Sequence, residues 1–153
     1  MALRNIVFSE NPLLRKKCRP VEHFDENLWE LLDDMKETMR ANNGCGLAGP
    51  QVAVLRRIAV IESNGMYFEL INPQITKMSG SQESNEGCLS VKNVNGLVIR
   101  PEKITVKALD RFGYEYTLSV EGFLSTVFCH EIDHLDGILF TDKAEKLFQK
   151  GTK

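Results

Sequence analysis

Two stretches of the chain place apolar residues at helical spacing, and the first lies between residues 25 and 44. Its apolar positions are Leu28, Leu31, Leu32, Met35 and Met39. Because positions three and four apart share one side of a helix, this spacing predicts an amphipathic helix. Asp25 suits the N-cap position, and the sequence from Asn42 to Gly44 is typical of a helix end.

The second helical pattern covers residues 121–136. Phe123, Val127, His130 and His134 fall on one side of this segment, as expected for residues spaced by three or four positions. Gly137 then provides a C-terminal stop. This side of the predicted helix therefore carries two apolar side chains in its first half and two histidines in its second half.

Four short runs between the helical stretches are rich in β-branched and aromatic residues. They read RIAVIE, MYFELI, ITVKAL and YEYTLSV, and they begin at Arg57, Met66, Ile104 and Tyr114. Gly, Asn, Pro and Asp residues separate them, which is typical of strands joined by turns. The order of helix, strands and helix predicts the α+β class, with antiparallel or mixed sheets around a central helix that carries the histidines.

Length and composition indicate one soluble domain spanning residues 1–153. Hydrophobic residues make up 42% of the chain and charged residues 26%, and the net charge is -2. A domain of this size can bury a core without a structural metal ion or disulfides. The charge balance argues against a specific nucleic-acid partner. No long apolar run indicates a membrane segment or a signal peptide, so we expect a cytoplasmic protein with free thiols.

The sequence CHEIDHLDG, residues 129–137, places two histidines four residues apart. On one helix face His130 and His134 can bind a single metal ion, while Glu131 leans toward the open side of that ion. The alternative is a chance match on a solvated helix, with Glu131 and Asp133 as surface charges. A catalytic metal ion usually has three protein ligands. Because the 19 residues after His134 include no histidine or cysteine, we expect the third ligand upstream.

Two upstream stretches contain candidate site residues. Cys88, in NEGCLSV, follows a glycine and precedes a short apolar run, so its thiolate is a candidate ligand, with an inert buried cysteine as the alternative. The glycine-rich stretch from Gly44 to Gln51 lacks the ending of a phosphate-binding loop, and a tight turn between a helix and a strand accounts for it equally well. Gln51 is the side chain of that stretch with a hydrogen-bond donor.

Taken together, these three stretches resemble the motifs of the peptide deformylase family. The family's sequences run G-x-G-L-A-A-x-Q, E-G-C-L-S and Q-H-E-x-D-H-L-x-G, and here they stand in the same order as residues 44–51, 86–90 and 129–137. The likeness extends over nearly the whole chain. It implies a metal-dependent hydrolase that removes the formyl group from the N-terminal formyl-methionine of nascent polypeptides and releases formate.

The resemblance also implies a role for each motif residue. The family's metal ligands correspond to Cys88, His130 and His134, and its catalytic carboxylate corresponds to Glu131. In such a site a metal-bound water attacks the formyl carbon, and the carboxylate acts as general base and then as general acid.

Further residues of the family's site bind the substrate. Gln51 and the backbone N–H of Leu89 correspond to the donors that stabilise the oxyanion, and Gly46 would contact the peptide backbone. The helix phase places Phe123, Thr126 and Val127 where a methionine pocket is needed, although core packing explains these three residues as well.

The cofactor and the partners follow from the same resemblance. It implies one divalent metal ion, with ferrous iron as the native ion and zinc, nickel or cobalt as alternatives that a Cys/His/His site accepts. The expected partners are formyl-methionyl nascent peptides. The ribosome is a further candidate partner, although the sequence after residue 137 is too short to supply in full the long C-terminal helix through which many members of the family contact it.

Three residues depart from the family pattern, and two other functions remain open. Gly49 stands in place of an alanine, Lys92 in place of a frequent proline, and Cys129 in place of the glutamine before the first histidine. None of these changes removes a ligand, so we expect activity to survive. The alternatives are a small metallopeptidase and a metal- or peptide-binding relative that has lost catalysis.

Overall fold

The structure, a computed structural model, describes residues 2–149. Its helical elements are η1 (Pro12–Arg15), α1 (Glu26–Ala41), η2 (Gly49–Val52), α2 (Phe123–Leu135) and α3 (Phe140–Lys143). Its strands are β1 (Gly46–Ala48), β2 (Ile58–Ser63), β3 (Met66–Ser79), β4 (Gln82–Cys88), β5 (Val91–Arg100), β6 (Lys103–Leu109), β7 (Glu115–Glu121) and β8 (Lys146–Gln149). The α+β class is confirmed.

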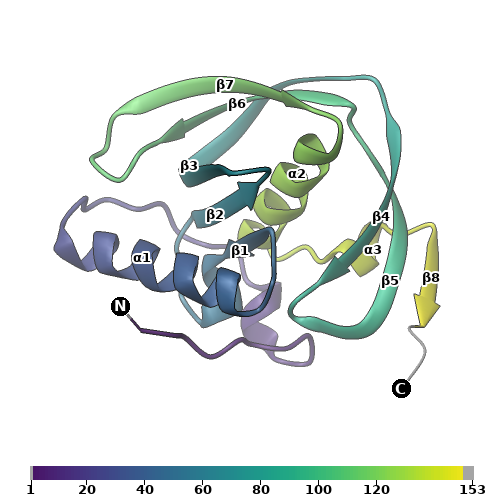
Figure 1. Ribbon diagram of the computed structural model, residues 1–153, viewed down its shortest axis with the longest axis horizontal. Coiled ribbons are helices and arrows are strands. Elements are labelled where there is room, and N and C mark those ends of the chain that lie inside the picture. Colours follow the sequence, from purple (N-terminus) through teal and green to yellow (C-terminus); the bar gives the residue numbers. More distant parts are fainter. Residues whose placement is uncertain (1, 150–153) are drawn as a thin grey trace.

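The strands form two antiparallel sheets (Figure 1). The larger has the order β1-β2-β3-β6-β7, and the smaller has the order β4-β5-β8. Strand β1 therefore lies at one edge of the larger sheet and β4 at one edge of the smaller. These two edges lie on either side of helix α2, which occupies the centre of the molecule as predicted.

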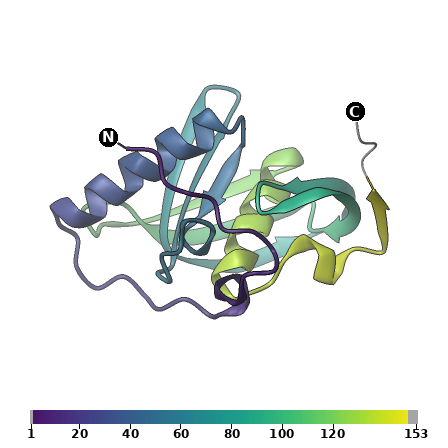
Figure 2. The ribbon, with the colours of Figure 1, turned by 90° about the horizontal axis from the view of Figure 1, so that it is seen from below.

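Helices α1 and α2 cover opposite faces of the larger sheet (Figure 2). Neighbouring residues of β2 show this directly, because successive side chains of a strand point to opposite faces. Ile58 and Val60 pack in the cluster formed with α1, whereas Ala59 and Ile61 pack in the cluster formed with α2. A third, smaller cluster joins the small sheet to α3 and η1.

The predicted helix boundaries agree with the structure to within about two residues. The side chain of Asp25 accepts a hydrogen bond from the backbone N–H of Leu28 at 3.3 Å, as an N-cap does. Helix α1 ends at Ala41, and Asn43 has a positive φ of 55°. The four predicted strands correspond to β2, β3, β6 and β7, and the sequence pattern missed β1, β4, β5 and β8.

Two structural findings bear on the composition-based expectations. No helix within residues 2–149 is long and apolar enough to cross a membrane. Over the same residues all four cysteines are free thiols.

Candidate active site

Three potential metal ligands meet between helix α2 and the end of strand β4. The ligand atoms of Cys88, His130 and His134 all lie within 4.8 Å of one another, and Cys88 Sγ is 3.4 Å from His134 Nε2. The two histidines share one side of α2 because they are about one helical turn apart. One thiolate and two imidazoles form a donor set that binds divalent transition metals. These residues therefore fit a metal ion.

The two histidine rings differ in their surroundings. His134 is 1% exposed, and burial lowers its pKa well below the ordinary value, so the ring is neutral, which is the form that binds a metal ion. His130 Nδ1 lies 3.0 Å from Glu86 Oε1. A carboxylate at Nδ1 orients the ring and leaves Nε2 for the ligand side.

A buried ion network supports the ring of His130 from behind. Arg100 on β5 is 2% exposed and donates two hydrogen bonds to Glu86 and one to Asp133, with distances of 2.7 to 2.8 Å. Burial alone would raise the pKa of Glu86, but the hydrogen bonds from Arg100 and His130 lower it to about 2. Lys143 lies 3.1 Å from Asp133 at the exposed end. Asp133 is thus an internal partner of this network and not a free surface charge.

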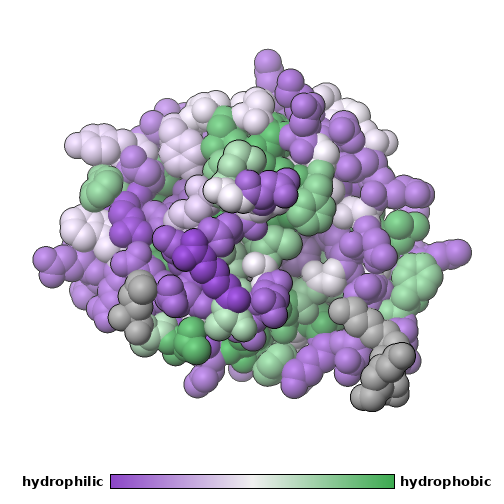
Figure 3. All heavy atoms as spheres, in the orientation of Figure 1, coloured by the Kyte–Doolittle hydropathy of each residue, from purple (hydrophilic) through white to green (hydrophobic). Residues whose placement is uncertain are grey.

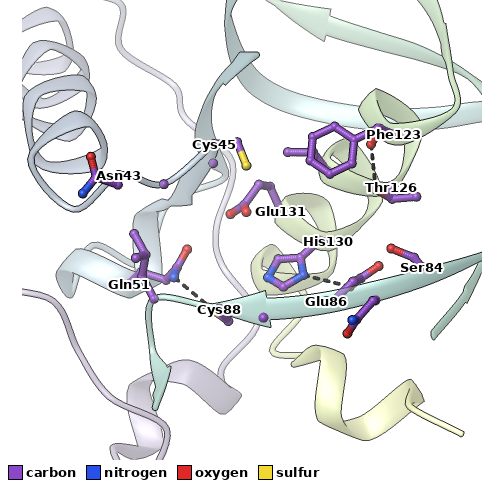
Figure 4. A pocket seen from close by; sticks show the side chains of 16 residues that line it. Asn43, Cys45, Gln51, Ser84, Glu86, Cys88, Phe123, Thr126, His130 and Glu131 are labelled. Carbon is purple, nitrogen blue, oxygen red and sulfur yellow. Dashed lines mark hydrogen bonds and ion pairs between the residues drawn. The ribbon is translucent and has the colours of Figure 1, made fainter. Parts of the chain in front are cut away.

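Glu131 faces a cavity of about 360 Å³ that lies beside the ligands (Figure 4). Its side chain is buried, and its Oε1 has no hydrogen-bond partner among the described residues. Burial raises its pKa to about 7. Gly46 lies directly against this carboxylate, because a Cβ at residue 46 would come within 2.6 Å of Glu131 Oε2. Only glycine lets strand β1 approach so closely.

The amide of Gln51 is held in one orientation beside Cys88. Its Oε1 accepts a hydrogen bond from the backbone N–H of Ala48 at 2.9 Å, and its Nε2 donates to Ser90 Oγ at 3.1 Å and to Cys88 Sγ at 3.5 Å. Leu89 lies in the tight turn between β4 and β5 and lines the same cavity. A donor side chain and a backbone turn thus lie next to the ligand set.

The first two turns of α2 form the wall of the cavity opposite Gln51 (Figure 4). Phe123 is 62% exposed, whereas Thr126 and Val127 are buried. Val127 lines the cavity and also packs in the central apolar cluster. Its position therefore agrees with both interpretations, a pocket wall and a core residue. Thr126 Oγ1 donates to the backbone carbonyl of Phe123 at 2.6 Å, which leaves its methyl-bearing side as part of the wall.

The structure brings the predicted site residues together. All of them except His134 line the one cavity, and His134 contacts Cys88 behind it. Sequence reasoning missed the roles of Arg100 and Ser90. Arg100 did carry a signal, because it is the one charged residue at the end of the otherwise apolar sequence LVIR.

Comparisons with known proteins agree with this geometry. The family model described as polypeptide deformylase matches residues 3–150. A peptide deformylase from Caldicellulosiruptor bescii is 57% identical over 143 residues, which is 94% of this chain and 86% of that protein.

Solved structures show the same fold. A crystal structure of a peptide deformylase from Legionella pneumophila has a TM-score of 0.90 at 43% identity, covering 94% of this chain and 86% of that chain. The crystal structure of peptide deformylase from Thermotoga maritima has a TM-score of 0.92 at 35% identity, and the match covers 94% of this chain and 99% of that chain.

Proposed function

This chain belongs to the polypeptide deformylase family, and from that premise we propose how its own residues remove the formyl group from nascent peptides. The enzyme is a hydrolase that acts on the N-formyl group of newly made chains. The observation that carries the assignment of roles is the convergence of Cys88, His130 and His134 beside the buried carboxylate of Glu131.

Cys88, His130 and His134 would hold the metal ion. When bound, a divalent ion supplies Lewis-acid chemistry, because it polarises a carbonyl group and lowers the pKa of water. We assign ferrous iron as the native ion by analogy with the family, and zinc, nickel and cobalt suit the same donor set. Metal analysis of protein purified without oxygen tests this assignment, and zinc as the dominant metal under those conditions would contradict it.

Glu131 moves the proton. Its carboxylate accepts a proton from the attacking water and donates that proton to the amine nitrogen as the C–N bond breaks. The support for this role is positional, since Glu131 Oε1 is buried, lacks a protein partner among the described residues and opens onto the cavity beside the ligands.

Gln51 and Leu89 stabilise the negative oxygen that forms when the formyl carbon is attacked. Gln51 Nε2 already lies beside Cys88, and the backbone N–H of Leu89 follows Cys88 in the chain. Removing one such donor typically raises the barrier by about 3 kcal/mol. Neither donor has to be recruited from a distant part of the molecule.

The peptide lies between two sheet edges. Strand β1 ends the larger sheet and β4 ends the smaller, and both line the cavity. An extended peptide can pair with such free edges, with Gly46 supplying backbone contacts. The methionine side chain then enters the part of the cavity lined by Phe123, Thr126 and Val127.

The cellular setting follows from the substrate. Formylated nascent chains are made in the cytoplasm, and we place the enzyme there, acting on chains that emerge from the ribosome. The described residues after α2 form the short helix α3 and strand β8.

The decisive experiment measures formate release from formyl-Met peptides by iron-loaded protein prepared without oxygen. Glu131→Gln should retain the metal and lose at least about 100-fold in turnover, whereas Glu102→Gln, at an exposed position, should behave as the unmodified enzyme. Cleavage inside unformylated peptides would indicate a metallopeptidase. Unchanged turnover in Glu131→Gln would refute the role of the carboxylate.

A further inference from the structure

A second cavity lies beside the first two turns of helix α1, and we call it the arginine pocket. It has a volume of about 390 Å³. One wall is the segment between η1 and α1, which runs along the lower edge of the view in Figure 2, and the opposite walls come from α1 and from the start of β2. The arginine pocket shares no lining residue with the active-site cavity. A molecule bound in it therefore does not occupy the space of the formylated peptide.

The floor of the arginine pocket is apolar. Val21, Leu28 and Ile58 line it and are buried, and Leu31 is partly buried. All four side chains belong to the apolar cluster formed with α1. The outward face of α1 is mainly hydrophilic in Figure 3, so the two leucines lie on the helix face that is turned toward the sheet. A floor of this kind suits an apolar group of a small ligand.

Asn72 on β3 holds the loop wall of the pocket in place. Its side-chain amide donates to the backbone carbonyl of Val21 at 3.0 Å, and its side-chain oxygen accepts from the backbone N–H of Val21 at 2.8 Å. The backbone N–H of Asn72 donates to the carbonyl of Arg57 at 2.9 Å. Asn72 has a positive φ of 52°, a conformation that asparagine tolerates better than most residues. Because both backbone groups of Val21 are anchored, the pocket is preformed.

Two arginine residues lie side by side at the rim of the pocket. Arg19 and Arg56 are partners in a parallel β-bridge, and both line the pocket and are exposed. Within residues 2–149 neither guanidinium group forms an ion pair. A guanidinium group has the planar geometry that matches a carboxylate. The rim therefore offers two cations to an anionic group above an apolar floor.

The acidic residues of the lining limit the charge that a ligand can carry. Glu22 and Asp25 line the pocket together with His23, and the Asp25 carboxylate already accepts the backbone N–H of Leu28. A dianion would be repelled by both acids, whereas a monoanion meets two guanidinium groups at the cost of a smaller repulsion. The same acids could accept hydrogen bonds from an ammonium group. The lining thus suits a small monocarboxylate, either a simple aliphatic acid or an apolar amino acid.

We propose that the arginine pocket binds a small carboxylate that has an apolar chain. The carboxylate contacts Arg19 and Arg56, and the chain lies on the floor formed by the apolar residues of α1 and β2. The proposal goes beyond the deformylase function and does not depend on it, because the two cavities have no lining residue in common.

The test titrates four probes into isotope-labelled, zinc-loaded protein and follows the backbone amide signals by NMR. Isocaproate carries the carboxylate and a branched chain, and leucine adds an ammonium group to the same skeleton. Isohexyl alcohol lacks the charge, and inorganic phosphate lacks the chain. We expect isocaproate to shift the signals of Val21, His23 and Leu28 with a Kd of about 1 mM. The alcohol and phosphate should bind at least about tenfold more weakly.

The comparison of isocaproate with leucine distinguishes the two sources of the carboxylate. Tighter binding of leucine would identify an amino acid as the ligand, with the acidic residues of the rim as partners of its ammonium group. Tighter binding of isocaproate would identify a simple aliphatic acid. Either order supports a carboxylate site, provided that the alcohol and phosphate remain the weaker probes.

Substitutions at the rim provide the matched variants. Arg19→Gln and Arg56→Gln should each weaken isocaproate binding by about tenfold, as expected when a hydrogen bond to a charged group is lost. Lys17→Gln is the control, because it removes the same charge from an exposed position two residues from Arg19 and outside the pocket. It should leave isocaproate binding unchanged. All three variants should release formate at the rate of the unmodified enzyme, because none of these residues lines the active-site cavity.

Three results would overturn the proposal. In the first, isocaproate shifts only signals of the active-site cavity, such as those of Gly46 and Leu89, which would place the acid at the metal site alone. In the second, both arginine variants bind isocaproate as tightly as the unmodified protein. In the third, Lys17→Gln weakens binding as much as the arginine variants do, which would indicate a general effect of charge and not a site at the rim.

Discussion

Replacing Arg100 by leucine removes the cation that Glu86 and Asp133 share. Arg100 is 2% exposed and its partners are 7% and 15% exposed, so the carboxylates cannot be solvated by bulk water once the cation is gone. Removing one partner of a buried ion pair destabilises a protein by about 3 to 5 kcal/mol. Asp133 keeps Lys143 at 3.1 Å and Glu86 keeps His130 at 3.0 Å, but Glu86 loses two hydrogen bonds and Asp133 only one, so the loss falls mainly on Glu86.

A second substitution distinguishes the effect of the lost ion pair from the effect of the lost packing of the Arg100 side chain. In the Arg100→Leu background, Glu86→Gln removes the buried charge that Arg100 no longer balances and should recover about 1 to 3 kcal/mol. Arg100→Lys keeps the charge but loses the two-pronged contact with Glu86, so its stability should lie between those of the unmodified protein and Arg100→Leu.

Urea unfolding of the metal-free protein is the assay, because bound metal would add its own stabilisation. For a domain of this length, the single change should also lower Tm by about 10 °C. An Arg100→Leu variant within about 1 kcal/mol of the unmodified protein, or further destabilisation by Glu86→Gln in that background, would refute the reasoning that an unpaired buried carboxylate dominates.

Three other changes test the metal ligands, the close approach of strand β1 to Glu131, and the loss of folding stability at low pH. Cys88→Ser should weaken metal binding by at least about 100-fold in a chelator competition assay, and unchanged affinity would place the third ligand elsewhere. Gly46→Ala adds a Cβ 2.6 Å from Glu131 Oε2, and the displaced carboxylate should lower formate release by about 100-fold at unchanged metal content. For Asp34, the hydrogen bond from the backbone N–H of Ala2 lowers the pKa below its ordinary value of 3.8. The stabilisation from this carboxylate is therefore complete above that value and is lost as pH falls through the folded-state pKa. Urea midpoints measured between pH 5 and pH 2.5 should fall less steeply for Asp34→Asn than for the unmodified protein, and parallel profiles would contradict the assignment.

Hydrophobic spacing predicted four strands that bury apolar side chains, and two of the strands it missed, β4 and β8, have no such buried apolar row. Strand β4, QESNEGC, points Ser84 and Glu86 inward, and the buried charge of Glu86 is matched by Arg100 on the neighbouring strand. A rule that expects apolar residues inside cannot recognise such a strand. Strand β8 is exposed at all four residues, so it carries no inward-facing signal at all.

The candidate site could be predicted further than the fold around it. His130 and His134 are related by helix geometry alone, which is local and readable from the sequence. Cys88 is brought to them by the pairing of β4 with β5 and by the packing of α2, neither of which its local sequence encodes. The three motifs identified it through their order along the chain. Arg100 had no motif, and only the tertiary structure brings its guanidinium group to within 2.8 Å of the Glu86 carboxylate.

The departures from the family pattern have local structural explanations that leave the ligands untouched. A Cβ at Gly49 would come within 2.6 Å of the Val54 carbonyl oxygen, so here the following loop packs against the space that an alanine methyl group would need. Lys92 Nζ lies 4.1 Å from the centre of the Phe8 ring, a contact that proline cannot make. Cys129 is buried in the central cluster, and burial raises its pKa to about 11, so it behaves as a small apolar side chain. Each exchange is thus accommodated by packing outside the metal ligands, which is why the geometry of the site persists.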